Sequence, residues 1–218
     1  KEGDNVFYFS TCGWMMWNWL VGALFSKATI ILYEGSPFFE GPMKLWDLAE
    51  NENITLFGTS AKYIDALRKS GYKPNINKKL NHLKCLCSTG SPLSPESFQF
   101  ISEYIKSDMQ IGSISGGTDI LSCFVLNNPL DDVVSGEIQG IGLGMSVEVF
   151  DHNGVSITDE PGELVCTKPF PSMPIMFWND PDGKKYRDAY FNYYPNIWRH
   201  GDWTKITERG TLIIYGRS

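Results

Sequence analysis

Along roughly the first half of the chain, the spacing of apolar and polar positions switches between a period typical of helices and one typical of strands. Runs typical of helices and runs typical of strands follow one another: helices at 14–25, 43–52, 60–71 and 94–107, strands at 28–34, 54–59, 83–88 and 109–115. Ser60 and Ser94 stand where N-caps are expected. Pro95 occupies a first helical position, and Gly71 stands where a helix would stop. This alternation predicts a parallel sheet covered by helices.

The pattern changes after about residue 125, where short β-patterned runs are broken by glycine and proline. Asn153-Gly154 is a hairpin signal within this part. We therefore expect an α/β fold in two parts. A parallel sheet covered by helices would occupy 1–126, and a small antiparallel, β-barrel-like subdomain would occupy 127–218.

Composition and charge exclude several classes of protein. Of the 218 residues, 42% are apolar and 14% aromatic, which is typical of a folded globular chain. The formal charge is −6 and no Lys/Arg-rich run is present, so nothing indicates binding to nucleic acid or to an anionic membrane. The most apolar run, 12–25, is shorter than a membrane span and contains Asn18, so we expect a buried helix and no membrane span.

The five cysteines are odd in number, and no secretion signal opens the chain, so reduced thiols and a cytoplasmic location are expected. Cys85 and Cys87 would share one face of a strand. The chain starts without an initiator methionine and stops without a polar tail. These features favour a piece of a longer protein, and the oligomeric state stays open.

Two glycine-rich loops follow predicted strands, "STGSPLS" at 88–94 and "SGGTD" at 115–119. In an open parallel sheet, ligands bind beyond the carboxyl ends of the strands, so both loops would lie at one edge of the sheet. Thr118 offers a hydroxyl suited to a phosphate, and Asp119 a carboxylate suited to Mg²⁺. From spacing alone, two ordinary strand-to-helix loops explain these residues equally well.

The segment 198–218 contains a second candidate pair. A carboxylate at Asp202 and a guanidinium at Arg217 could together grip a vicinal diol such as a ribose. From these residues alone, the simpler interpretation is that Asp202 and Arg217 are unrelated charged residues on the surface. "GIGLGMS" at 140–146 resembles a dinucleotide loop, but no helix follows it, so we interpret it as turns and bulges.

Taken in order, these motifs resemble the adenylate-forming superfamily of acyl-CoA synthetases, luciferases and adenylation domains. "STGSPLS" is similar to the G-x-P-L loop of that family, "SGGTD" to its Thr-Glu motif, "RHGDW" to its T/S-G-D motif and "YGRS" to its G-R-x-D hinge. "GELVCTKP" matches a G-E-L/I strand. The resemblance covers essentially the whole chain as a central part of the large N-terminal domain, and implies that 127–218 ends at the hinge to a C-terminal domain that this chain lacks.

The resemblance also implies roles for individual residues. ATP, Mg²⁺, a small carboxylic acid and the co-substrate CoA would be the ligands. Thr118 would contact the α-phosphate and Asp119 the Mg²⁺, as the catalytic pair. The adenosine would be held by Gly90, Ser91 and Pro92 on one side, by Ser113, Ile114, Ser115 and Gly117 on the other, and by Asp202 and Arg217 at the ribose. The acyl pocket would be lined by Trp14, Met15, Met16 and Gly116.

Gly116 indicates which acid would be activated. In acetyl-CoA synthetases a tryptophan that closes the acyl pocket stands two residues before the motif threonine, and here that position is Gly116. Absence of an indole leaves space, so a longer acid such as acetoacetate would fit. The resemblance thus implies an AMP-forming acid–CoA ligase.

Three departures keep other functions open. Asp119 is shorter than the usual glutamate, and both the upstream phosphate loop and the C-terminal domain with its lysine are absent. The piece alone is therefore expected to be inactive. One alternative is a ligase for another short or medium carboxylic acid. The others are a nucleotide-binding module without turnover and a non-enzymatic α/β protein whose loops mimic the motifs.

Overall fold

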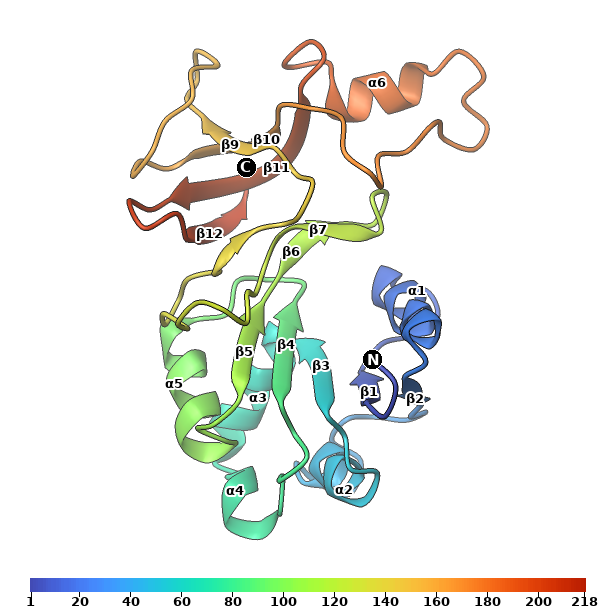
Figure 1. The fold of residues 1–218 in the computed structure, drawn as a ribbon, viewed down its shortest axis with the longest axis vertical. Helices are drawn as coiled ribbons and strands as arrows, with labels where there is room; N and C mark the ends of the chain where they lie inside the picture. The colour runs from blue at the N-terminus through green and yellow to red at the C-terminus, as the bar shows by residue number, and fades with distance from the viewer. The chain divides into compact units, whose positions relative to one another are not determined.

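The computed structural model describes residues 1–218, which form two compact units, 1–114 and 115–218 (Figure 1). The expected boundary after residue 126 therefore lies inside the second unit. The reason is a hairpin of β6 (Ser115–Gly117) and β7 (Ser122–Leu126), which joins β8 (Gly140–Ile141) in a three-stranded antiparallel sheet. The hairpin pairs within the second unit, although its sequence directly continues the last parallel strand.

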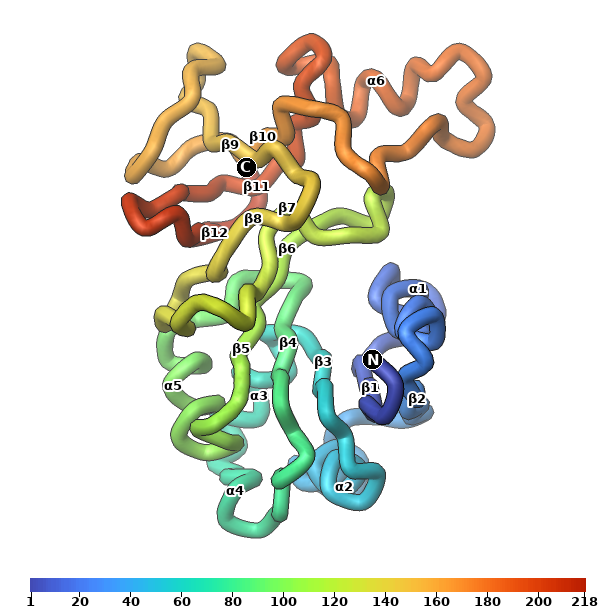
Figure 2. Tube along the Cα trace, viewed as in Figure 1, coloured from blue at the N-terminus to red at the C-terminus, as the bar shows by residue number.

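The first unit contains a five-stranded sheet in the order β2-β1-β3-β4-β5, and every neighbouring pair is parallel. This confirms the predicted parallel α/β architecture. Along the chain, which can be followed in Figure 2, its elements are β1 (Asn5–Tyr8), α1 (Met15–Gly22), the 3-10 helix η1 (Ala23–Ser26), β2 (Thr29–Ile31), α2 (Lys44–Asn51), β3 (Leu56–Ser60), α3 (Ala61–Ser70), α4 (Pro74–Asn77), β4 (Cys85–Thr89), α5 (Pro95–Tyr104) and β5 (Gln110–Ser113).

The predicted helix caps are confirmed. The Ser60 hydroxyl accepts a hydrogen bond from the Tyr63 backbone N–H at 3.2 Å, and α3 ends at Gly71 with a left-handed φ of 76°. The Ser94 hydroxyl accepts from the Ser97 N–H at 3.3 Å at the start of α5. The last turn of α3 is thus closed by a residue without Cβ strain, and both helices begin with a satisfied donor.

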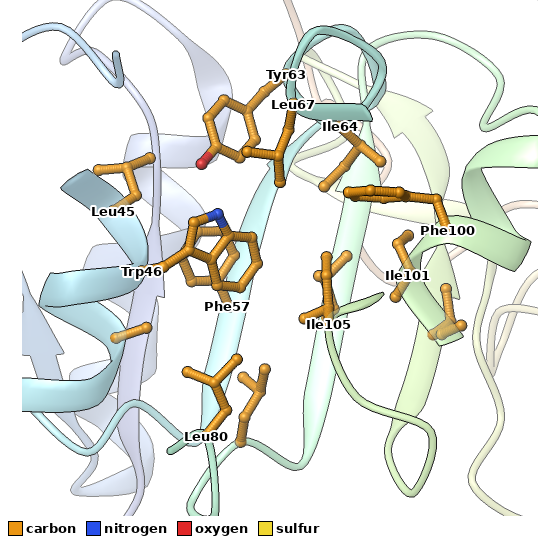
Figure 3. Close-up of a cluster of buried hydrophobic side chains, with 14 of the residues drawn as sticks. Leu45, Trp46, Phe57, Tyr63, Ile64, Leu67, Leu80, Phe100, Ile101 and Ile105 are labelled. Atoms are coloured by element: carbon orange, nitrogen blue, oxygen red, sulfur yellow. The ribbon is translucent and has the colours of Figure 1, made fainter. Parts of the chain in front are cut away.

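One face of the parallel sheet carries the main core of the first unit (Figure 3). Side chains of α2, α3 and α5 pack there against strand residues such as Phe57 and Leu86. Trp46 and Phe57 are both fully buried, and their rings stack with centroids 4.7 Å apart. On the opposite face, Tyr8 makes edge contacts with Trp14 and Trp19 from the α1 region. Helices therefore cover the sheet, as the apolar pattern predicted.

The second unit is built of antiparallel strands, as predicted. Besides the β6-β7-β8 sheet it has a four-stranded sheet in the order β12-β11-β10-β9, and an isolated bridge joins Ile138 to Leu212. The Asn153-Gly154 signal marks a tight turn, closed by a bridge between Phe150 and Ser156. Its further elements are β9 (Val147–Phe150), β10 (Gly162–Cys166), α6 (Lys184–Tyr190), β11 (Trp198–Ile206) and β12 (Leu212–Arg217).

The structure contains no helix with the length and apolar character needed to cross a bilayer. All five cysteines are free thiols. The Sγ atoms of Cys85 and Cys87 lie 3.6 Å apart on β4, which confirms that they share one face of the strand.

Candidate functional site

In the first unit, the two predicted adenosine-binding loops begin side by side. β4 and β5 are parallel neighbours with Ser88 opposite Ser113, so both strands end at the same edge of the sheet. The Thr89 hydroxyl donates to the Ile114 carbonyl oxygen at 2.8 Å, and the Ile114 N–H donates to the Ser88 carbonyl oxygen at 2.9 Å. These bonds fix the start of the 88–94 loop against the end of β5, at the position where such sheets bind ligands.

The loop after β4 also lies next to the predicted acyl-binding residues of α1. Gly90 has a left-handed φ of 86°, and an added Cβ would lie 3.6 Å from Cζ2 of Trp14. Ser91 is half-buried and Pro92 is exposed. Met15 and Met16, at the start of α1, are buried. The first unit thus brings Trp14 to the adenine-side loop, while the two methionines contribute to the packing of their own helix.

In the second unit, Thr118 and Asp119 lie in the turn that joins β6 to β7. Both residues are exposed, and the Leu121 N–H donates back to the Thr118 carbonyl oxygen at 3.3 Å. The Asp119 carboxylate accepts a hydrogen bond from the hydroxyl of Tyr190, the last residue of α6. The turn therefore presents a free hydroxyl and a carboxylate that is tethered on one side.

Gly116 stands in a part of β6 that has no room for a side chain. A Cβ at this position would lie 1.9 Å from the carbonyl oxygen of Ser122 and 2.7 Å from the Cα of Cys123, both backbone atoms of the facing strand. The β6–β7 register shifts at this point. Close pairing of the two strands is thus a sufficient reason for glycine, and the predicted opening of the acyl pocket at Gly116 stays a prediction.

Asp202 and Arg217 are brought directly opposite each other on β11 and β12. Arg217 Nη1 donates to Asp202 Oδ1 at 2.8 Å, and the Ser115 hydroxyl donates to Asp202 Oδ2 at 3.0 Å. The Asp202 side chain is only 8% exposed, whereas that of Arg217 is 72% exposed. A carboxylate has about four acceptor sites, so two remain for hydroxyl groups of a ligand.

Glu163 on β10 supports the strand that carries Asp202. Its buried carboxylate accepts from Arg199 Nε at 2.9 Å and from the Gly201 N–H at 2.8 Å. Gly201 has a left-handed φ of 84° and directly precedes Asp202. The pairing of β10 with β11 is irregular between Glu163 and Val165. Glu163 therefore holds the backbone of β11 in the irregular conformation from which Asp202 extends.

His200 connects two of the predicted residues. Its Nε2 lies 3.1 Å from the Gly116 carbonyl oxygen and 3.6 Å from Asp202 Oδ2. Because a carbonyl oxygen only accepts, Nε2 carries the hydrogen, and the buried Nδ1 has no hydrogen-bond partner. Burial holds the pKa of the imidazole below its usual value, against the charge of Asp202, which raises it. His200 is thus a neutral brace between β6 and β11.

A cavity of about 500 Å³ opens in the second unit beside Arg217. Its wall includes the aromatic side chains of Tyr193, Tyr194 and Trp203, and the Arg199 guanidinium lies over the Tyr193 ring at 4.9 Å from its centroid. Arg217 is the only predicted site residue in that wall. The cavity therefore does not gather the predicted adenosine site.

The chemistry of the Asp119 turn is compatible with Mg²⁺ that arrives with a nucleotide. No group of three or more His, Cys, Asp or Glu side chains in the structure could hold a metal by itself. Asp119 supplies one exposed carboxylate, and Mg²⁺ is often bound by one or two carboxylates together with substrate phosphates and water. The residues present thus fit a metal that takes most of its ligands from phosphate oxygens.

Three residues of this region were not predicted from the sequence: Glu163, Tyr190 and His200. Glu163 had a usable signal, because it is the single charged residue of the apolar strand "GELVC". His200 stands in the motif "RHGDW", two residues before Asp202. Tyr190 had no signal, since its partner Asp119 lies 71 residues away in the sequence.

Loops at the carboxyl ends of parallel strands, followed along the chain by a β unit that presents a paired carboxylate and guanidinium, are features of a ligand-binding α/β protein. The chain belongs to the AMP-binding enzyme family, whose model matches residues 1–174. It is 57% identical over 218 residues to an acetoacetyl-coenzyme A synthetase of Rhizobium meliloti (strain 1021), covering all of this chain and 34% of that protein.

Other relatives carry the same name. The chain is 48% identical over 219 residues to an acetoacetyl-CoA synthetase of Gallus gallus, covering all of this chain and 33% of that protein. A solved structure, acetoacetyl-CoA synthetase from Streptomyces lividans, superposes with a TM-score of 0.93 at 48% identity, over all of this chain and 34% of that one. The chain therefore spans about a third of the length of the curated relatives it matches.

Proposed function

We propose that the chain forms adenosine- and acyl-binding parts of an ATP-dependent, AMP-forming acid–CoA ligase that activates acetoacetate. The observation that carries this proposal is the match of the entire chain to proteins named acetoacetyl-CoA synthetase, in sequence and in structure. Since the chain spans a third of those proteins, the activity is assigned to the whole protein of which such a chain is a part. By itself the chain is proposed to bind nucleotide without turnover.

The reaction has two steps. A carboxylate oxygen of acetoacetate attacks the α-phosphorus of ATP, and the bond from that phosphorus to pyrophosphate breaks, which leaves acetoacetyl-AMP. The sulfur of CoA then attacks the acyl carbon, its proton is lost, and AMP leaves with the electrons of the broken carbon–oxygen bond. Catalysis of this kind rests mainly on positioning and on stabilisation of charge.

The residues of each unit suggest what they do in these steps. In the first unit, the backbone of Gly90 and the neighbouring Ser91 and Pro92 would border the adenine. Trp14, which lies next to Gly90, would help to line the acyl pocket. In the second unit, the exposed Thr118 hydroxyl would donate to the α-phosphate, and Asp202 would accept from the ribose hydroxyls. Mg²⁺ held at Asp119 would neutralise charge on the phosphate oxygens.

A ligase for another acid is the second candidate. Met15 and Met16 have flexible thioether side chains that adapt to several ligand shapes, and the backbone at Gly116 explains its glycine without reference to a substrate. The free thiols are consistent with a reducing compartment such as the cytoplasm, which we include in the proposal.

The test is pyrophosphate release by the full-length protein with ATP, Mg²⁺, CoA and a panel of acids: acetate, propionate, acetoacetate, octanoate and benzoate. A preference for acetoacetate is expected. A preference for another acid would support the ligase function and contradict acetoacetate as the substrate. Absence of release with every acid would contradict the ligase and favour the binding module.

A matched pair of variants tests the ribose assignment. Asp202→Asn should raise the KM for ATP about tenfold to a hundredfold, because a hydrogen bond to a charged group contributes about 1.5–3 kcal/mol. Asp188→Asn is the control, because Asp188 lies in the same unit on the exposed helix α6 and forms only a surface pair with Lys184. Equal KM values in the two variants would contradict the role of Asp202.

A further inference from the structure

The carboxylate of Asp119 is tethered by a side chain from a distant part of the second unit. Asp119 lies in the exposed turn after β6, where an aspartate side chain is free to rotate. The hydroxyl of Tyr190 donates a hydrogen bond to Asp119 Oδ2, across 71 residues of sequence. Only one of the two carboxylate oxygens is engaged in this bond, and the other, Oδ1, has no hydrogen-bond donor from the protein.

The ring of Tyr190 is held rigidly. It stacks on the buried indole of Trp198 with centroids 3.5 Å apart and an interplanar angle of 15°. Tyr186 and Phe177 contact it edge-on at 6.1 and 6.2 Å. With its ring fixed in this cluster, Tyr190 presents its hydroxyl at one place, and that place is the Asp119 carboxylate.

Tyr190 is the donor in this bond, because its hydroxyl carries the hydrogen and the carboxylate oxygen of Asp119 accepts it.

We propose that Tyr190 is a positioning residue that fixes the Asp119 carboxylate so that its free oxygen is presented to a divalent cation carried by the nucleotide. The proposal rests on the function proposed above, in which Asp119 binds the metal of Mg²⁺–ATP. Carboxylates that ligate metals are commonly held by a second hydrogen bond, and loss of such a partner typically weakens metal binding about 10- to 100-fold.

Tyr190→Phe removes the hydroxyl and keeps the stacked ring. Tyr186→Phe is the matched control, because Tyr186 belongs to the same aromatic cluster and its buried hydroxyl has no hydrogen-bond partner. Both variants should retain the melting temperature of the wild type within a few degrees. A merely structural role of the aromatic cluster would affect both alike.

The experiment measures Mn²⁺ binding to the full-length protein in the presence of an ATP analogue that cannot release pyrophosphate. Electron paramagnetic resonance of Mn²⁺ monitors the binding. Tyr190→Phe should weaken Mn²⁺ binding about tenfold or more, and Tyr186→Phe should leave it unchanged. In the Asp119→Ala background, Tyr190→Phe should have no further effect, since the hydroxyl acts through the carboxylate.

Each contrary result overturns the proposal in a different way. Unchanged Mn²⁺ affinity in Tyr190→Phe would show that the tether does not position the carboxylate. If Tyr190→Phe weakened Mn²⁺ binding as much in the Asp119→Ala background as in the wild type, Tyr190 would act elsewhere than through Asp119. Unchanged Mn²⁺ affinity in Asp119→Ala would show that the metal does not bind at this turn. Because the titration needs no acid and no turnover, failure of the proposed ligase activity would be seen separately, in pyrophosphate release.

Discussion

Replacing Glu163 by glutamine removes one negative charge from the interior of the second unit and keeps the shape of the side chain. The carboxylate is 7% exposed and accepts from Arg199 Nε at 2.9 Å and from the Gly201 N–H at 2.8 Å. A glutamine retains one acceptor oxygen, so one of these two hydrogen bonds becomes a bond to a neutral group. The amide NH₂ of the glutamine would face the other donor, so that bond is lost. The substitution therefore tests how strongly this carboxylate holds β11.

The expected cost can be derived from these contacts. Bonds to a charged group contribute about 1.5–3 kcal/mol and neutral bonds about 0.5–1.5 kcal/mol. Arg199 is 36% exposed and recovers hydration when its partner is lost, whereas the N–H of Gly201 loses its charged partner in the interior. We expect a loss of about 2–3 kcal/mol in the free energy of unfolding. Because Gly201 precedes Asp202, the KM for ATP should rise as well.

Urea unfolding of the full-length protein measures the first effect, and pyrophosphate release at varied ATP measures the second. Glu148→Gln is the control, since Glu148 lies on the neighbouring strand β9 and accepts from the neutral hydroxyl of Thr167. It should lose less than about 1 kcal/mol. If Glu163→Gln is no more costly than Glu148→Gln and leaves the KM for ATP unchanged, Glu163 does not hold the strand of Asp202.

Four further outcomes are expected of the same unfolding measurements. Ser60→Ala should cost about 1 kcal/mol through loss of the α3 cap, and no loss would contradict the capping bond. Phe57→Ala should cost about 3–5 kcal/mol, because the ring is fully buried and stacked on an indole; a loss below that range would mean that the core refills the space. Gly116→Ala should cost at least about 1–3 kcal/mol, while Gly140→Ala, whose added methyl would meet nothing, serves as its control. Burial lowers the pKa of His200 in the folded state, so the unfolded chain binds more protons below about pH 6.5 and stability falls as pH drops through that range. This fall should be smaller in His200→Asn, and equal slopes in the two proteins would contradict a buried neutral imidazole.

The parallel architecture was predictable because its signals are local. Ser60, Gly71 and Ser94 mark helix ends through bonds to residues one to four positions away, and these assignments were confirmed. β1 was not predicted, although it lies inside the sheet between β2 and β3. It has only four residues and, unlike the equally short β5, it does not follow a predicted helix that would mark it as the next strand of the alternation.

Helix α6 was missed for a related reason. It begins at a left-handed Gly183 with no side-chain cap of its own. Its first turn is held instead by Asp180, whose carboxylate accepts from the N–H groups of Lys185 and Tyr186 at 3.0 and 2.9 Å. An acidic residue so far ahead of a helix does not match the usual capping spacing, so the pattern did not indicate a helix there.

The chemical groups of the candidate site could be named from the sequence, but the residues that hold them could not. Thr118, Asp119, Asp202 and Arg217 stand in short motifs whose residue types indicate phosphate, metal and diol binding. Whether the side chains of these motifs come together depends on which residue lies opposite each of them on the neighbouring strand. Strand register determines that pairing. A single register change would separate Asp202 from Arg217, since residue faces alternate along each strand.

The partners of the two candidate-site carboxylates come from far along the chain. Asp202 is bonded to Ser115 across 87 residues, and Asp119 to Tyr190 across 71. His200 adds a bond to Gly116 across 84 residues, so β6 and its turn are fastened repeatedly to the segment 190–202. A substitution in that segment should therefore change how the β6 turn meets a ligand even where the substituted residue touches none. For this reason a test of the candidate site should vary the supporting residues as well as the motif residues.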